Sequence, residues 1–130
     1  MDHKSRLVVI VDDDESIQCA VQDLLESAGL SARAFGSAEN FLESGLYRET
    51  ACLITDIRMP RMSGLELQVR LKEDQCNVPI IFITAHGDAR TRLEAMKQGA
   101  IELLSKPFDH QVLLGKVRAV LEVNHSGGLD

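Results

Sequence analysis

The 130-residue sequence lacks several features that would assign it to other classes of protein. No apolar run approaches the ~18 residues of a transmembrane helix. The first apolar run, Leu7–Val11, leads into three aspartates rather than into a signal-peptide cleavage site. The cysteines number three, are widely spaced and form no CxxC motif. We therefore predict a cytoplasmic protein with reduced thiols.

Positive charge is also scarce. The chain has 14 lysines and arginines against 20 aspartates and glutamates, a net charge of −6 at pH 7. Direct binding of nucleic acid requires a basic patch, so none is expected of this chain itself. The turn after the first apolar run is acidic, from Asp12 to Glu15, and has no glycine cluster. This excludes a Rossmann dinucleotide site.

Five short apolar segments alternate with stretches of helical length. Segments of this length, bounded by polar or turn residues, are typical of strands buried on both faces of a parallel sheet. The predicted strands are 7–11, 31–35, 51–55, 80–83 and 101–104. The order predicts a (βα)5 chain, and so an α/β fold with a doubly wound five-stranded parallel sheet and helices on both faces.

Capping residues place most of the helices. Ser37, Asp88 and Asp109 are predicted N-caps of the second, fourth and fifth helices, and Gly29 is predicted to end the first. Helical spacing predicts that Ala89, Leu93 and Met96 form the inward face of the fourth helix.

The segment from Leu65 to Leu71 is ambiguous. Its apolar residues alternate strictly with polar ones, which on periodicity alone indicates a strand. We predict a helix, because Ser63 and Glu66 have the spacing of a capping box and two parallel strands need a crossover between them.

The candidate site lies where the predicted strands end. Ligands of open α/β sheets bind beyond the carboxyl ends of the strands. Three carboxylates, a hydroxyl and an ammonium group are predicted to meet there. They belong to the residues that follow four different strands: Asp12 and Asp13, Asp56, Thr84 with Ala85, and Lys106 with Pro107.

Such a cluster of carboxylates needs a cation. Two carboxylates ~4 Å apart repel by roughly 4 kcal/mol at an effective dielectric constant of 20. Oxygen ligands suit Mg²⁺, which can bind phosphate at the same time, and Lys106 adds positive charge. A carboxylate in this setting can attack phosphorus and form an aspartyl phosphate. Each residue alone also has an ordinary structural interpretation, as a turn, a cap or a solvated side chain.

Four motifs resemble those of the receiver domains of two-component response regulators. The resemblance extends from about Arg6 to Val123 and is greatest for FixJ-type (LuxR/FixJ family) receivers. It implies a CheY-like, flavodoxin-like fold with strand order 2-1-3-4-5. The motifs are VIVDDD at 9–14, TDIRMPRMSG at 55–64, ITAHGD within 81–88 and SKPF at 105–108.

The resemblance implies a phosphoacceptor and a metal site. Asp56 is expected to accept a phosphoryl group from a sensor histidine kinase. Mg²⁺ is expected to bind Asp13, Asp56 and the backbone carbonyl of Arg58 directly, and Asp12 mainly through a water molecule.

The resemblance also implies how the phosphoryl group is held. Lys106 is expected to pair with it, through a cis Lys106–Pro107 bond. Thr84 is expected to donate a hydrogen bond to it, and Ala85 to leave it room.

Two flanking residues, Arg58 and His86, are expected to tune hydrolysis of the acyl phosphate. Leu103 departs from the family pattern, in which an aromatic side chain often moves inward behind the threonine. The threonine half of the switch is retained, whereas an aromatic readout is not.

Phosphorylation is expected to shift the fourth helix and fifth strand, and the charged residues there allow a homodimer. A solvated face of a monomer fits these charged residues equally well.

Two different functions also fit parts of the sequence. One is a haloacid-dehalogenase-type phosphatase, suggested by Asp12-x-Asp14-x-Ser16, and the second is a pseudo-receiver that signals without phosphate. The phosphatase would leave Asp56 without a role.

The domain is expected to span 1–124, followed by a tail or linker start at 125–130, rich in serine and glycine. The expected output is transcription, through a DNA-binding domain outside this chain. Neither a membrane nor an enzymatic activity on other substrates is expected.

Overall fold

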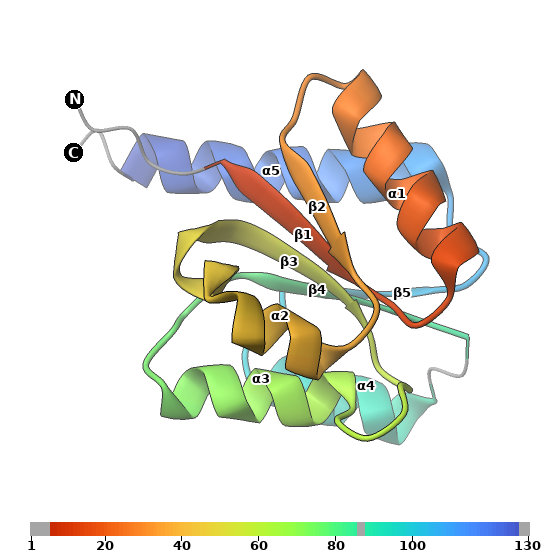
Figure 1. The fold of residues 1–130 in the computed structure, drawn as a ribbon, viewed down its shortest axis with the longest axis vertical. Helices are drawn as coiled ribbons and strands as arrows, with labels where there is room; N and C mark the ends of the chain where they lie inside the picture. Colours follow the sequence, from red (N-terminus) through yellow and green to blue (C-terminus); the bar gives the residue numbers. More distant parts are fainter. Residues whose placement is uncertain (1–5, 86–87, 128–130) are drawn as a thin grey trace.

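The computed structural model describes residues 6–85 and 88–127, which form a parallel sheet between two layers of helices (Figure 1). The strand order is β2-β1-β3-β4-β5, and every neighbouring pair is parallel. Both the fold class and the order 2-1-3-4-5 are confirmed. The strands are β1 (Leu7–Val11), β2 (Ala32–Phe35), β3 (Thr50–Asp56), β4 (Ile80–Thr84) and β5 (Glu102–Ser105).

Helices α1 and α5 cover one face of the sheet, and α2, α3 and α4 cover the other (Figure 1). The α5 helix extends three residues past residue 124, where the domain is predicted to end, and that boundary stays a prediction. The helices are α1 (Glu15–Ser27), α2 (Ala38–Ser44), the 3-10 turn η1 (Leu46–Glu49), α3 (Gly64–Glu73), α4 (Ala89–Lys97) and α5 (His110–Gly127).

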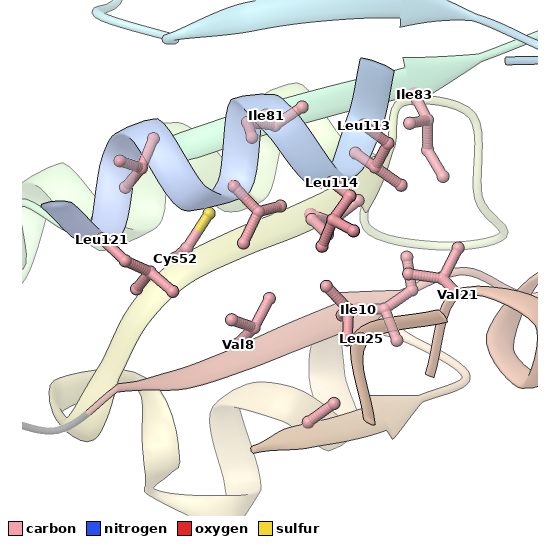
Figure 2. Packing of buried hydrophobic residues seen from close by; sticks show 14 residues of the cluster. Val8, Ile10, Val21, Leu25, Cys52, Ile81, Ile83, Leu113, Leu114 and Leu121 are labelled. Carbon is pink, nitrogen blue, oxygen red and sulfur yellow. The ribbon is translucent and has the colours of Figure 1, made fainter. Parts of the chain in front are cut away.

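The central strands are apolar throughout because both of their faces are buried. Val8 and Ile10 point toward α1 and α5, whereas Val9 and Val11 point toward the other layer, and none of the four is exposed. Figure 2 shows the hydrophobic core on the α1 and α5 face, where side chains of α5 such as Leu121 lie over the strands. The sheet is therefore packed between two hydrophobic cores, one on each face, and these fix the positions of the carboxyl ends of its strands.

The predicted caps are present. Ser37 and Asp88 accept hydrogen bonds from backbone N–H groups in the first turns of α2 and α4, and Asp109 does so for α5. The Ser63 and Glu66 side chains complete both halves of the capping box of α3. These local contacts start each helix close to the carboxyl end of a strand.

The helical prediction for α3 is confirmed, and its structure explains the misleading alternation. Leu67 and Leu71 lie one turn apart on the buried face. Leu65 and Val69 lie one turn apart on the other, partly exposed side of the helix, because two residues correspond to about 200° of rotation. Two helical stripes offset by two residues produce an alternating sequence.

The predicted inward face of α4 is wrong. Leu93 is 62% exposed and Met96 38% exposed, whereas Ala95 is fully buried. The inward stripe instead passes through Thr91, Ala95 and Gln98. A nine-residue helix with few apolar side chains does not fix its own rotation, and here the smallest residue allows the closest approach to the rest of the fold.

Candidate functional site

The carboxylates of Asp12 and Asp56 lie on either side of Lys106. The Lys106 Nζ is 2.9 Å from Asp12 Oδ2 and 3.1 Å from Asp56 Oδ2. Asp12 directly follows β1, Asp56 ends β3 and Lys106 directly follows β5, so the sheet order brings the three together. Asp12 is fully buried and Asp56 is 7% exposed.

Asp13 completes an acidic cluster. Carboxylate oxygens of Asp12, Asp13 and Asp56 all lie within 4.8 Å of one another, and Asp13 is exposed, so the cluster opens to solvent. Oxygens that share one Mg²⁺ lie up to roughly 4 Å apart, because each is ~2.1 Å from the ion. The three side chains are therefore near enough to share a small divalent cation once they approach one another.

Burial and ion pairing act on the pKa values of this site. Burial raises the pKa of Asp12, and hydrogen bonds from Lys106 and from the Asp14 backbone N–H offset this only in part. Burial alone would lower the pKa of Lys106, but its bonds to Asp12 and Asp56 raise it. The lysine is thus held in its charged form.

Asp12 is fixed by contacts that the sequence pattern does not indicate. Its Oδ1 accepts the Asp14 N–H at 2.9 Å, while Asp14 itself caps α1 through the Ser16 N–H. Gln18, in the first turns of α1, donates from Nε2 to the Asp12 carbonyl at 2.8 Å. A glutamine in an amphipathic helix gives no sequence signal of such a role.

Gly64 fixes the backbone of Asp56. A Cβ atom on Gly64 would lie 2.2 Å from the Asp56 carbonyl oxygen, and the Gly64 N–H donates to the Ile57 carbonyl at 2.8 Å. The start of α3 therefore packs directly on the end of β3. The Asp56 carboxylate also accepts the Arg58 N–H, at 3.3 Å.

Thr84 ends β4, Ala85 follows it, and Arg58 and Pro107 each lie two residues beyond the ends of β3 and β5. Thr84 is 1% exposed, and its carbonyl accepts the Lys106 N–H at 2.8 Å, which joins the ends of β4 and β5. Ala85 and the Arg58 side chain are exposed. The Lys106–Pro107 bond is cis, as predicted. His86 lies outside the described residues.

Leu103 lies away from the acidic cluster. It is 4% exposed and packs in the core beneath α2, α3 and α4. Its backbone carbonyl accepts a hydrogen bond from Arg92 Nη1 of α4 at 3.1 Å. Leu103 is thus a core residue that also anchors α4 through its backbone.

The family model of the response regulator receiver domain matches residues 8–118. The chain belongs to this family. Receiver domains are in general phosphorylated by a kinase and bind Mg²⁺ at an acidic cluster such as the one described here. Membership decides against the phosphatase hypothesis. None of the described helices has both the length and the apolar character needed to span a membrane.

Curated relatives include transcriptional regulators. The chain is 42% identical to the response regulator TodT of Pseudomonas putida, over 95% of this chain and 54% of TodT. It is 45% identical to nodulation protein W of Bradyrhizobium diazoefficiens, over 89% and 51%. The transcriptional regulator FixJ of Azorhizobium caulinodans is 41% identical, over 88% and 54%. The chain spans about half the length of these relatives.

Solved structures agree with the fold. The response regulator StyR superposes with a TM-score of 0.85 at 43% identity, over 96% of this chain and 64% of StyR. The structure of FixJ-N gives a TM-score of 0.80 at 36% identity, over 94% and 96%. The predicted resemblance to FixJ-type receivers is confirmed.

Proposed function

We propose that Asp56 is the residue of this receiver that accepts the phosphoryl group, and that a sensor histidine kinase supplies it. The contrast between the two buried carboxylates supports this assignment. Both oxygens of Asp12 are engaged at 2.9 Å, by the Asp14 N–H and by Lys106. Asp56 is held less tightly, at 3.1 and 3.3 Å, and is slightly exposed. An oxygen of Asp56 is therefore the freer nucleophile.

The proposed metal ligands are Asp13, Asp56 and the Arg58 carbonyl, with Asp12 acting mainly through a water molecule. When bound, Mg²⁺ would neutralise negative charge on the transferred phosphoryl oxygens. In the transfer, a bond forms between phosphorus and an Asp56 oxygen, while the bond from phosphorus to the donor atom breaks.

The remaining site residues have proposed roles that follow from their positions. Lys106, held charged by both carboxylates, moves its ion pair from the free Asp56 carboxylate to the phosphoryl group. Thr84 donates its hydroxyl proton to a phosphoryl oxygen, and Ala85 leaves space for the group. Arg58 and His86 set how fast water hydrolyses the acyl phosphate. In this proposal the domain catalyses only its own phosphorylation and dephosphorylation.

The phosphorylated state is proposed to change the face formed by α4 and β5. Arg92 of α4 binds the Leu103 carbonyl and lies 3.4 Å from Glu102, which in turn pairs with Lys116 of α5 at 3.3 Å. A shift of α4 would break or rearrange this chain of contacts without an aromatic switch. The exposed Leu93 and Met96 are next to it on α4, and we propose that they pack against a second copy in a homodimer.

The output is proposed to lie outside this chain. The relatives TodT and FixJ are about twice as long as the matched region, and FixJ is a transcriptional regulator. We propose that residues 1–124 form the receiver, that 125–130 begin a linker, and that a DNA-binding domain in the cytoplasm follows. This chain itself binds neither nucleic acid nor a membrane in the proposal.

Incubation with acetyl phosphate and Mg²⁺ tests the phosphoacceptor. Intact-protein mass spectrometry should show one added phosphoryl group, which Asp56→Asn abolishes and EDTA suppresses. Asp23→Asn, on the exposed surface of α1, should label like the wild type. Labelling of Asp56→Asn at the wild-type level would contradict the assignment, and absence of labelling in the wild type would favour a pseudo-receiver.

A further inference from the structure

A groove of about 410 Å³ runs along the outer side of α3. The groove begins at Met62, just before the helix, and follows one side of α3 as far as Glu73. Glu94 of α4 forms part of its border. Lys106, Asp12 and Asp56 are not among its lining residues, so the groove is separate from the acidic cluster.

Three apolar side chains line the groove. Leu65 and Val69 lie one turn apart on α3, and Met62, just before the helix, extends this apolar row along the groove. Met62 and Leu65 are partly buried against the core, and Val69 is 41% exposed. This row matches the spacing of the apolar stripe on an amphipathic helix, which docks through residues three and four apart.

The rim of the groove is acidic. Within residues 6–85 and 88–127, none of Glu66, Glu73 and Glu94 forms an ion pair with a basic side chain. The basic residue on the rim, Arg70, is 3.8 Å from the carboxylate of Asp74. Three glutamates against one arginine give the rim a net negative charge, which is complementary to lysine or arginine residues beside an apolar stripe.

We propose that this groove docks an amphipathic, basic helix of a partner protein. The ten residues of α3 span ~15 Å, which accommodates two to three turns of such a helix. A contact of this length lies at the low end of specific interfaces, so the complex is transient and sensitive to salt. The proposal does not depend on phosphotransfer at Asp56.

The charges decide against two other occupants. A second copy of this chain docked groove to groove would bring one acidic rim against another. Nucleic acid would be repelled by the same glutamates. A basic helix is favoured by both the apolar row and the rim.

The test uses the whole chain, labelled with ¹⁵N, and a synthetic 18-residue peptide with leucines at helical spacing flanked by lysines. Titration should shift the backbone amides of residues 62–73 and 94, and Val69→Asp should weaken binding roughly tenfold. Val112→Asp, at an equally exposed position of α5 (46% against 41%), should bind like the wild type. A peptide of the same composition in scrambled order should bind weakly.

Charge reversal supplies the second arm. The double variant Glu73→Lys/Glu94→Lys should weaken binding by about tenfold, since two attractions become repulsions. Glu26→Lys/Glu43→Lys makes the same change in net charge on exposed residues of α1 and α2 and should have little effect. Equal losses in both double variants, equal binding of the scrambled peptide, or amide shifts centred on another face would overturn the proposal. Concentration-dependent shifts of the same amides without peptide would assign the groove to a second copy instead, and would also overturn it.

Discussion

Gly64 has no side chain, and the backbone of Asp56 occupies the space where one would lie. A methyl group there would be 2.2 Å from the Asp56 carbonyl oxygen, and backbone cannot move aside cheaply. We predict that Gly64→Ala lowers the free energy of unfolding by roughly 1–3 kcal/mol, measured by urea denaturation. Phosphorylation by acetyl phosphate should also slow, because the end of β3 must shift.

Gly115 is the matched control for this substitution. It lies in α5, and a Cβ atom there would have no neighbour within 4 Å. Gly115→Ala should therefore raise stability by about 0.5–1 kcal/mol, the usual advantage of alanine over glycine inside a helix. Equal effects of the two variants would show that Gly64 is not sterically required.

The buried Asp12 makes the metal-free protein sensitive to pH. Burial raises the pKa of this carboxyl above its ordinary value of 3.8. Asp12 therefore loses its proton less readily in the folded than in the unfolded state. The neutral side chain contributes stability that is fully present below pH 3.8 and is lost as the pH rises through the raised pKa. We predict that Asp12→Asn, which stays neutral, becomes more stable relative to wild type as pH rises through this window. Urea denaturation in EDTA measures the difference, and a difference that is constant with pH would contradict the prediction.

Residues with their own chemistry could be predicted at the site, and residues that act through packing could not. Asp12, Asp56 and Lys106 could be predicted because each follows or ends a strand and each carries a charge. Gln18 and Gly64 fix the backbone of the two aspartates, but they do so through contacts between elements. Such contacts exist only once the sheet and helices are assembled, so local sequence patterns do not reveal them.

At the level of single elements, α3 depends on its capping box. The Ser63 Oγ accepts the Glu66 N–H at 3.1 Å, and the Glu66 carboxylate accepts the Ser63 N–H at 2.8 Å. Ser63→Ala should cost about 1 kcal/mol of stability, whereas Ser63→Gly should cost only a few tenths. Thermal unfolding followed by circular dichroism compares them. Equal losses would indicate that the cap does not stabilise α3.

The helices α3 and α4 show what sequence patterns resolve. For α3, the capping signal correctly outweighed the alternating pattern, because a cap specifies where a helix begins. For α4, the Asp88 cap was correct but the buried face was wrong. Its rotation is set by Ala95, whose carbonyl accepts a hydrogen bond from the buried Gln68 of α3. A side chain on another helix leaves no trace in the α4 sequence.

For the molecule as a whole, the fold class followed from the apolar segments, but the strand order did not. Segment lengths predict parallel strands and crossovers. They do not say that β1 lies between β2 and β3, which is what brings Asp12 next to Asp56. The order came from the resemblance of the motifs to receiver domains, and the structure confirms it.

The proposed homodimer is a property of the whole molecule and can be tested by its sedimentation. We predict that beryllofluoride, as a phosphoryl mimic with Mg²⁺, raises the sedimentation coefficient of the wild type toward that of a dimer. Leu93→Asp should weaken this association about tenfold or more, because it puts a charge in the apolar contact. Val69→Asp, on α3, should still dimerise. An unchanged sedimentation coefficient for the activated wild type would contradict the dimer.

The division of the core into two clusters has a consequence for synthesis of the chain. The cluster beneath α1 and α5 joins Val8 and Ile10 of the first strand to Leu113, Leu114 and Leu121 of the last helix (Figure 2). The other cluster draws on residues no later than Leu103. A nascent chain can therefore bury one side of its sheet while the opposite side is still bare, and it would expose an apolar surface to chaperones until α5 leaves the ribosome.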